Sequence, residues 1–174
     1  MDLHLSEKVA VVTGASKGIG LATTQALASE GVAVVAGALH GSAELDAVTG
    51  ARFVQVDLST PTGPASLVDA AIQQHGGLDL LVNNVGAVRP RIHGFLALTD
   101  EDWTWAMNLN FVAAVRAMRA ALPHLAQRPG ASIVTISSVN AFLPDPGVID
   151  YSAAKGALTN VCKSLSKNSA HGYA

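Results

Sequence analysis

A tyrosine and a lysine stand four residues apart, at Tyr151 and Lys155, at the start of a stretch typical of a helix. This spacing puts both side chains on one helical face, one turn apart. A free phenol ionises near pH 10, but an ammonium roughly 4 Å away, at an effective dielectric constant of about 20, favours the phenolate by around 4 kcal/mol. The pair therefore fits a general acid and base that works near neutral pH. The spacing alone leaves a surface pair open as the alternative.

Two polar residues belong with this pair. Ser138 closes an apolar run thirteen residues before Tyr151, and its hydroxyl can hydrogen-bond a substrate oxygen that gains negative charge. Asn110 lies inside a long helical stretch, where asparagine is a poor helix former. Its position indicates a purpose, such as holding a water molecule against Lys155, with tolerated polarity as the alternative. The predicted catalytic residues are Asn110, Ser138, Tyr151 and Lys155.

A glycine-rich segment, Gly14-Ala-Ser-Lys-Gly18-Ile-Gly20, joins an apolar run to a helical pattern near the start of the chain. Glycines remove the side chains that would block the approach of a pyrophosphate, and the N-terminus of a helix favours an anion. The segment therefore predicts the phosphate cradle of a dinucleotide site. An ordinary glycine-rich turn is the alternative.

Further polar residues follow later strands. Asp57 can accept a hydrogen bond from an adenine amino group, or simply cap its own strand. In Asn83-Asn84-Val85-Gly86 the side-chain amides can brace adjacent loops, and Gly86 lets a cofactor approach the backbone. A simple Asn/Gly turn is the alternative. The predicted cofactor-binding residues, besides Tyr151 and Lys155, are Gly14, Ser16, Lys17, Gly18, Ile19, Gly20, Asp57, Leu58, Asn84 and Gly86.

The choice between NAD and NADP depends on the residues after the second strand. An acidic residue there holds the ribose 2′-hydroxyl of NAD, and an arginine accommodates the 2′-phosphate of NADP. The chain has Gly37-Ala38-Leu39-His40 at this point, which supplies neither. Lys17 can meet a 2′-phosphate, so the sequence favours NADP over NAD, but a solvated lysine explains Lys17 nearly as well.

Short apolar runs alternate with amphipathic stretches along the chain. This pattern predicts an α/β fold, a Rossmann-like doubly wound parallel sheet of about five strands, in one domain over residues 1–174. The loops 86–94 and 142–150 each follow a strand, so they should lie at the carboxyl edge of the sheet, where such folds bind ligands. Thr99 can cap the long third helix. The expected strands are 9–13, 32–36, 52–56, 78–82 and 132–137. The expected helices are 19–29, 64–75, 100–126 and 152–167, with a weaker one at 44–48.

Composition excludes several classes of protein. The chain is 49% hydrophobic and 14% charged, which suits a large core and argues against disorder. A net charge of −2 indicates no basic face for nucleic acid or an anionic membrane. No apolar run is long enough to span a membrane, and the start does not read as a secretory signal. The single cysteine, Cys162, and the scattered histidines indicate a cytoplasmic protein without a bound metal.

Together these motifs resemble the short-chain dehydrogenase/reductase family, in its compact single-domain branch. The resemblance runs from about residue 8 to residue 169 and includes the order and spacing of every motif above. It implies an NAD(P)-dependent oxidoreductase that moves a hydride between a nicotinamide and a small alcohol or ketone. It also implies that Tyr151 is the general acid and base, Lys155 holds the ribose hydroxyls, Ser138 positions substrate and Asn110 serves a proton relay. It further implies a homo-oligomer formed through the helices 100–126 and 152–167.

The chain departs from the family pattern at its end. Family members continue with a sixth strand, a Pro-Gly loop over the nicotinamide, a substrate lid and a seventh strand, and none of these is present before Ala174. We therefore expect a domain truncated at its C-terminus, with strand 132–137 as an open edge prone to pairing. Two hypotheses remain at this point. The chain is an oxidoreductase, or it is a catalytically silent fragment that binds a dinucleotide weakly or associates with other chains.

Overall fold

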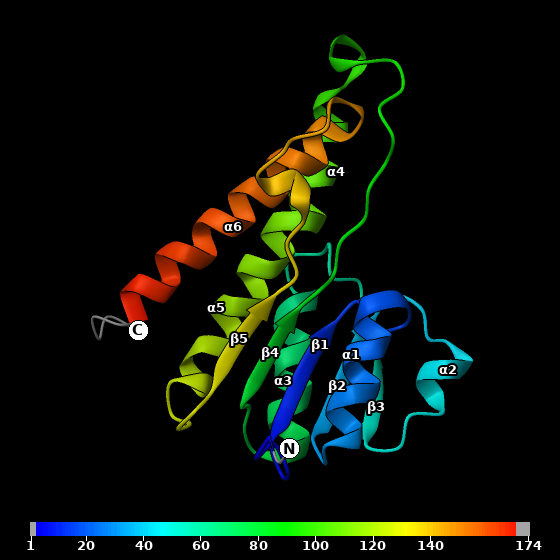
Figure 1. The fold of residues 1–174 in the computed structure, drawn as a ribbon. Coiled ribbons are helices and arrows are strands. Elements are labelled where there is room, and N and C mark those ends of the chain that lie inside the picture. The colour runs from blue at the N-terminus through cyan, green and yellow to red at the C-terminus, as the bar shows by residue number, and fades with distance from the viewer. Residues whose placement is uncertain (1–2, 170–174) are drawn as a thin grey trace.

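Five short apolar segments form a parallel sheet at the centre of the structure, a computed structural model that describes residues 3–169 (Figure 1). The strand order is β3-β2-β1-β4-β5, so the chain changes direction across the sheet between β1 and β4. In sheets of this kind the crevice at that switch point is the ligand site. The predicted fold class is confirmed. The strands are β1 (Val9–Thr13), β2 (Ala33–Ala38), β3 (Ala51–Gln55), β4 (Leu80–Asn83) and β5 (Ser132–Thr135).

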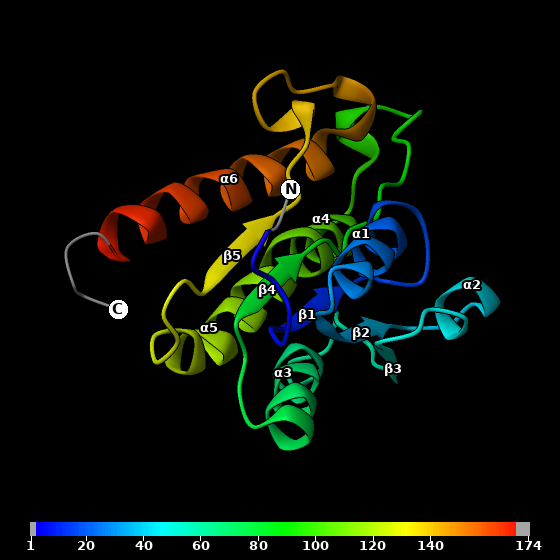
Figure 2. The same cartoon turned by 60° about the horizontal axis from the view of Figure 1, so that its bottom comes forward.

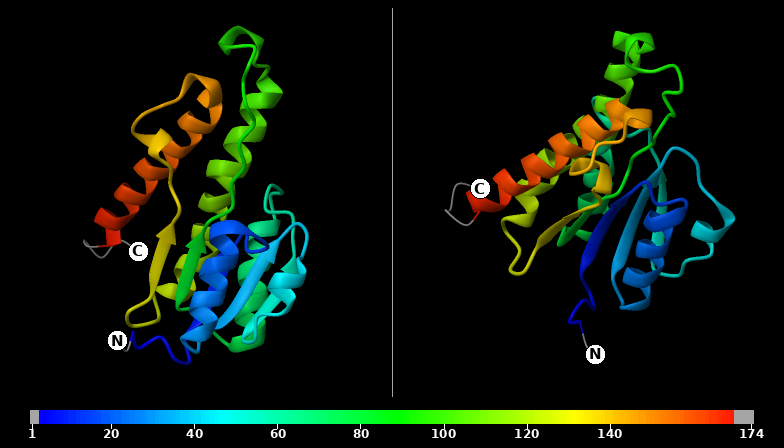
Figure 3. Two further views of the ribbon diagram at one scale, coloured as in Figure 1. Left: turned by 45° about the vertical axis from the view of Figure 1, so that its right-hand side comes forward. Right: turned by 45° about the horizontal axis from the view of Figure 1, so that its top comes forward.

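Helices cover both faces of this sheet, so the side chains on both faces of β1 are buried and the whole strand is apolar. Val9 and Val11 pack into one core, toward α3, α5 and α6, whereas Ala10 and Val12 pack into a second core toward α1. Figure 2 shows α1 and α3 on opposite sides of the sheet, and Figure 3 shows α6 beside β5, at the end of the sheet away from β3. The helices are α1 (Gly18–Ser29), α2 (Ala43–Asp46), α3 (Gly63–His75), α4 (Asp100–Met107), α5 (Ala113–Leu125) and α6 (Ile149–Ser169).

The expected helix 100–126 is interrupted. Its start is as predicted, because Thr99 and Asp102 form a reciprocal capping box at the first turn of α4. A π-helical turn, Asn108–Val112, then separates α4 from α5. The Asn110 side chain donates a hydrogen bond to the carbonyl oxygen of Ala106 at 3.0 Å, the group that the regular helix ladder would use at this position. Such competition between a side chain and the backbone explains the local change of helix type.

Element boundaries also differ from the expected ones by a few residues. The helix that carries the Tyr151–Lys155 pair begins at Ile149 and not at residue 152, because a short 3-10 turn over Pro146–Val148 leads directly into it. Tyr151 therefore lies in the first turn of α6. No helix in the part of the chain that the structure describes combines the length and the apolar character needed to cross a membrane. The final residues, 170–174, lie outside the described residues.

Candidate active site

A cleft of about 1160 Å³ lies at the carboxyl edge of the sheet. The glycine-rich loop, the ends of the strands and the first turns of α6 line it. All the residues predicted to bind cofactor line this cleft except Gly20, while Asn110 and Ser138 of the catalytic set lie outside its lining. The predicted residues that do line it are Gly14, Ser16, Lys17, Gly18, Ile19, Asp57, Leu58, Asn84, Gly86, Tyr151 and Lys155.

The turn from β1 into α1 is built for close backbone approach. A Cβ atom on Gly20 would stand 2.2 Å from the carbonyl oxygen of Gly14, so no larger residue fits there. Gly14 itself has a φ of +67°, which favours glycine. The first turn of α1 has no side-chain cap from Lys17 and no acidic residue, so its N–H groups have no partner from these side chains. This bare, glycine-lined helix start fits the pyrophosphate of a dinucleotide.

Hydrogen bonds from β4 hold this turn in place. The side-chain amide of Asn84 donates to the carbonyl oxygens of Thr13 at 2.9 Å and Gly14 at 3.0 Å. The hydroxyl oxygen of Thr13 accepts the backbone N–H groups of Asn84 at 2.9 Å and Val85 at 3.0 Å. Asn84 therefore braces the two loops, as its sequence context indicates. The part played by Thr13 is not evident from the sequence, since a threonine at a strand end is common.

Side-chain hydrogen bonds also fix the loop after β3, which lines the same cleft. Oδ1 of Asp57 accepts hydrogen bonds from the hydroxyl of Ser59 at 2.7 Å and from its backbone N–H at 2.9 Å, and these bonds, the hydroxyl's first, lower the pKa of this carboxyl. Arg116 donates to the carbonyl oxygens of Ser59 and Thr60, both at 3.2 Å, and to Asn108 at 3.0 Å. The strand-end cap considered for Asp57 is therefore present. Arg116 and Asn108 are partners that sequence reasoning missed.

Asn110 lies in the π-helical turn Asn108–Val112 and hydrogen-bonds to the loop after β4. It is 1% exposed. Its Oδ1 accepts the backbone N–H of Ala87 at 2.9 Å, and its Nδ2 donates to the carbonyl oxygen of Ala87 at 2.9 Å. A Cβ atom on Gly86 would stand 2.9 Å from this Oδ1 and 3.5 Å from Nζ of Lys155. The structure thus brings Asn110, Gly86 and Lys155 together, and the relay role of Asn110 stays a prediction.

Tyr151 and Lys155 both line the cleft from one face of α6. Nζ of Lys155 lies 5.8 Å from the centroid of the Tyr151 ring and donates a hydrogen bond to the carbonyl oxygen of Ile136 at 2.8 Å. Burial lowers the pKa of the Lys155 ammonium. A buried cation at the end of β5, next to a phenol, can favour the phenolate and can also donate to polar groups of a ligand.

Ser137 and Ser138 follow β5, and their side chains have different surroundings. The oxygen of Ser138 accepts the backbone N–H of Asn140 at 3.2 Å and so caps the short 3-10 turn Val139–Ala141. The neighbouring Ser137 lines the cleft instead, with its hydroxyl 2.6 Å from that of Thr159. Because Ser138 only accepts in its capping bond, its own hydroxyl proton remains available. Its contact with a substrate stays a prediction.

The parallel sheet, its strand order and the helices on both of its faces define a domain of the Rossmann type. A family model described as short chain dehydrogenase matches residues 8–172. The chain therefore belongs to the short-chain dehydrogenase/reductase family, as its motifs indicate.

Individual relatives agree with this assignment. An uncharacterized oxidoreductase of Methylorubrum extorquens is 41% identical over 168 residues, which cover 90% of this chain and 65% of that protein. Human dehydrogenase/reductase SDR family member 4 is 34% identical over 168 residues, covering 92% of this chain and 60% of that one. L-sorbose reductase from Gluconobacter frateurii, solved with NADPH and L-sorbose, has a TM-score of 0.90 at 32% identity and covers 99% of this chain and 68% of its own. The chain thus spans 60–65% of the length of these two curated relatives.

Proposed function

We propose that this chain holds NADP(H) or NAD(H) in the cleft and that its enzyme transfers a hydride between the nicotinamide and a small alcohol or ketone. The observation that carries the proposal is that one cleft contains both the glycine-lined start of α1 and the Tyr151–Lys155 pair. The similarity to a reductase solved with NADPH supports it.

Each end of the cleft has a separate task in this proposal. The backbone of the Gly14–Gly20 turn and the N-terminus of α1 bind the pyrophosphate. Asp57 and Leu58 flank the adenine. Gly86 leaves room beside Lys155, whose ammonium donates to the ribose hydroxyls. When bound there, the nicotinamide supplies a hydride donor or acceptor.

Tyr151 handles the proton. During oxidation its phenolate takes the hydroxyl proton of the alcohol as the hydride leaves the adjacent carbon, and during reduction its phenol returns a proton to the carbonyl oxygen. The Lys155 ammonium favours the phenolate. Ser138 donates its free hydroxyl proton to the substrate oxygen, and Asn110 holds the water through which protons reach Lys155.

The test is the variant Tyr151→Phe, made in a version of the chain extended with the C-terminal third of a relative and measured by the change in nicotinamide absorbance with a panel of ketones and secondary alcohols. It should lose turnover and keep its cofactor affinity, because the ring still packs while the proton donor is gone. Tyr173→Phe, at the other tyrosine of the chain, serves as the matched control. Turnover that survives in Tyr151→Phe would remove this residue from the mechanism.

One observation favours a second candidate function, in which the 174-residue chain binds a dinucleotide and does not turn over a substrate. Within the described residues β5 is an edge strand, and Val134 on it is 51% exposed. Positioning of substrate can contribute roughly 7–11 kcal/mol of the barrier reduction, and an open site loses much of it. Robust turnover by the 174-residue chain would exclude this candidate. Turnover only after fusion to the C-terminal third of a relative would support it.

Two finer proposals accompany this function. Lys17 lines the cleft and gives a modest preference for NADP over NAD. A homo-oligomer forms through α4, α5 and α6, where an apolar groove of about 640 Å³ runs between α5 and α6 along Leu122, Val161 and Leu165. Light scattering tests the oligomer, and a monomer at all concentrations would contradict it.

A further inference from the structure

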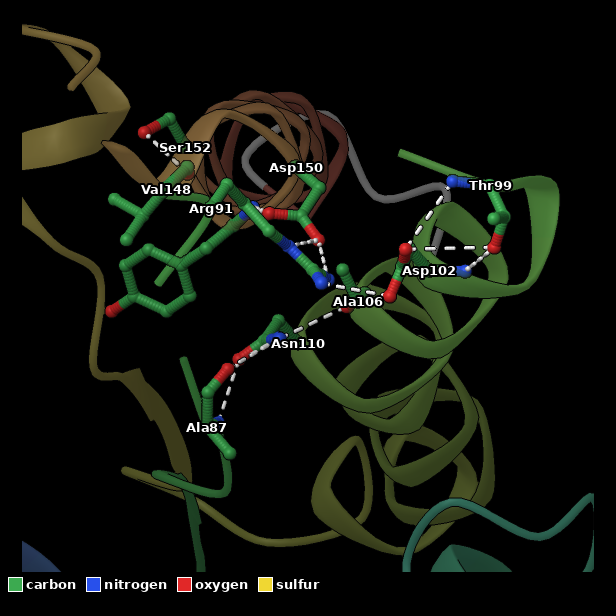
Figure 4. Close-up of polar contacts among 10 residues, drawn as sticks. Ala87, Arg91, Thr99, Asp102, Ala106, Asn110, Val148, Asp150 and Ser152 are labelled. Atoms are coloured by element: carbon green, nitrogen blue, oxygen red, sulfur yellow. Dashed lines mark hydrogen bonds and ion pairs between the residues drawn. The ribbon is translucent and has the colours of Figure 1, made fainter. Parts of the chain in front are cut away.

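Arg91 lies in the loop between β4 and α4, and its guanidinium meets carboxylates from two different helices (Figure 4). Its Nε donates to Oδ2 of Asp150 at 3.0 Å, and its Nη2 forms an ion pair with the same oxygen. Its Nη1 donates to Oδ1 of Asp102 at 2.7 Å. The backbone N–H of Arg91 also donates to the carbonyl oxygen of Gly147 at 2.7 Å. One residue therefore joins the loop after β4 to the starts of both α4 and α6.

These charges are withdrawn from water. The side chain of Arg91 is 10% exposed, that of Asp150 is 2% exposed and that of Asp102 is 26% exposed. Asp150 raises the pKa of Arg91 further above its ordinary range, so the guanidinium stays charged. A buried ion pair adds little net stability compared with an apolar pair of similar size, but losing one partner leaves a costly unpaired charge. Stability alone therefore explains this arrangement poorly.

The carboxylate of Asp150 connects Arg91 to the neighbouring residue, Tyr151. While Oδ2 of Asp150 binds Arg91, Oδ1 accepts the backbone N–H of Tyr151 at 2.9 Å. Tyr151 belongs to the first turn of α6, where backbone N–H groups have no helical partner. The loop after β4, which carries Arg91, is also held by Asn110, which hydrogen-bonds to both backbone groups of Ala87. Arg91 and Asn110 thus fix the two ends of the segment 87–91 (Figure 4).

We propose that Arg91 is a positioning residue, which acts through Asp150 to fix the first turn of α6 and to keep an unpaired negative charge away from the Tyr151 phenol. This inference rests on the acid–base role proposed for Tyr151. Nζ of Lys155 lies 5.8 Å from the centroid of the Tyr151 ring, and Asp150 accepts the backbone N–H of Tyr151. Arg91 pairs with Asp150 and with Asp102 on α4. Without Arg91, the carboxylate of Asp150, the residue next to Tyr151, is left unpaired, and an unpaired negative charge close to a phenol disfavours the phenolate.

The chain offers a direct measurement, because Tyr151 and Tyr173 are its only tyrosines. In a Tyr173→Phe background, labelling with [13Cζ]tyrosine gives one NMR signal that reports the ionisation of Tyr151. Arg91→Met should move the pH midpoint of this ionisation upward, since it removes a positive charge and leaves the Asp150 carboxylate unpaired. The double variant Arg91→Met/Asp150→Asn should move it back. Arg89→Met is the matched control, because Arg89 is an exposed arginine of the same loop that stacks on Trp105.

A second variant covers the case in which Arg91→Met does not fold. Arg91→Lys keeps the positive charge but cannot reproduce all three guanidinium contacts. It should raise the hydrogen-exchange rate of the Tyr151 amide about tenfold and leave the amides of β1 unchanged. A midpoint equal in Arg91→Met and Arg89→Met, or an unchanged Tyr151 amide in Arg91→Lys, overturns the inference. Neither readout needs cofactor or substrate, so failure here is distinguishable from failure of the proposed function.

Discussion

Lys155 lies one helical turn from Tyr151, with its ammonium nitrogen 5.8 Å from the centroid of the tyrosine ring. The ammonium is held there by the carbonyl oxygen of Ile136, at the end of β5. This contact leaves other N–H groups of the ammonium for a ligand. The strand end, the lysine and the phenol therefore form one unit at the carboxyl edge of the sheet.

Lys155→Met should change how stability depends on pH. Burial lowers the folded-state pKa of Lys155 below its unfolded value, which is about 10.4. Below the folded-state pKa the lysine is charged in both states, and burying that charge costs stability. Between the two values the unfolded chain binds more protons, so the free energy of unfolding rises with pH, and above both values the penalty is gone. The stability of the wild type relative to Lys155→Met should therefore rise from neutral pH toward pH 10.

Urea denaturation at several pH values measures this difference. Lys163→Met is the control, because Lys163 is exposed on the same helix. A difference between the wild type and Lys155→Met that does not change with pH would show that burial of the ammonium carries no such penalty.

Asn110→Ala should lower the free energy of unfolding by roughly 1–3 kcal/mol, because it removes a buried side chain and leaves the half-buried backbone groups of Ala87 without that partner. Asn108→Ala, two residues away in the same π-helical turn, should cost less, because Asn108 is only half-buried. Urea titration of both variants gives the comparison. If Asn110→Ala is as stable as the wild type, the hydrogen bonds from Asn110 to the loop after β4 do not contribute to the stability of the fold.

Lys17→Ala should weaken NADPH binding about fivefold or less and leave NADH binding unchanged, because an exposed charge pair contributes roughly 0.2–1 kcal/mol. Dissociation constants for both cofactors, measured by calorimetry with the wild type and the variant, check this expectation. Tighter binding of NADH than NADPH by the wild type would reverse the assignment.

The sheet and the phosphate turn could be predicted because their signals are local. The apolar residues of Val9–Thr13 are buried on both faces of the sheet, and the glycines that follow leave a bare helix start. A uniformly apolar run therefore predicts a strand covered on both faces, and the glycines after it predict a helix start open to a phosphate. The order of the motifs along the chain then identified the family.

The features that the sequence did not reveal depend on side chains reaching the backbone or distant charges. The π-helical turn at Asn110 arises from one side-chain hydrogen bond to Ala106, which a helical pattern does not show. Which of Ser137 and Ser138 lines the cleft depends on the residue at which β5 ends, since one position reverses the direction of a side chain. Arg91 and Asp150 are 59 residues apart, and nothing near either of them indicates the other.

Cofactor binding by the 174-residue chain tests the central claim most directly. NADPH and NADH are titrated into folded protein and followed by cofactor fluorescence, with folding checked by circular dichroism.

Gly20→Ala is the test variant, since its Cβ would stand 2.2 Å from the carbonyl oxygen of Gly14. Gly156→Ala is the matched control, because a Cβ there meets nothing closer than the carbonyl oxygen of Ala141 at 3.8 Å. We predict saturable binding of at least one cofactor below millimolar concentration by the wild type and by Gly156→Ala, weakened at least about tenfold in Gly20→Ala. Folded wild-type protein that binds neither cofactor at millimolar concentration would contradict the account.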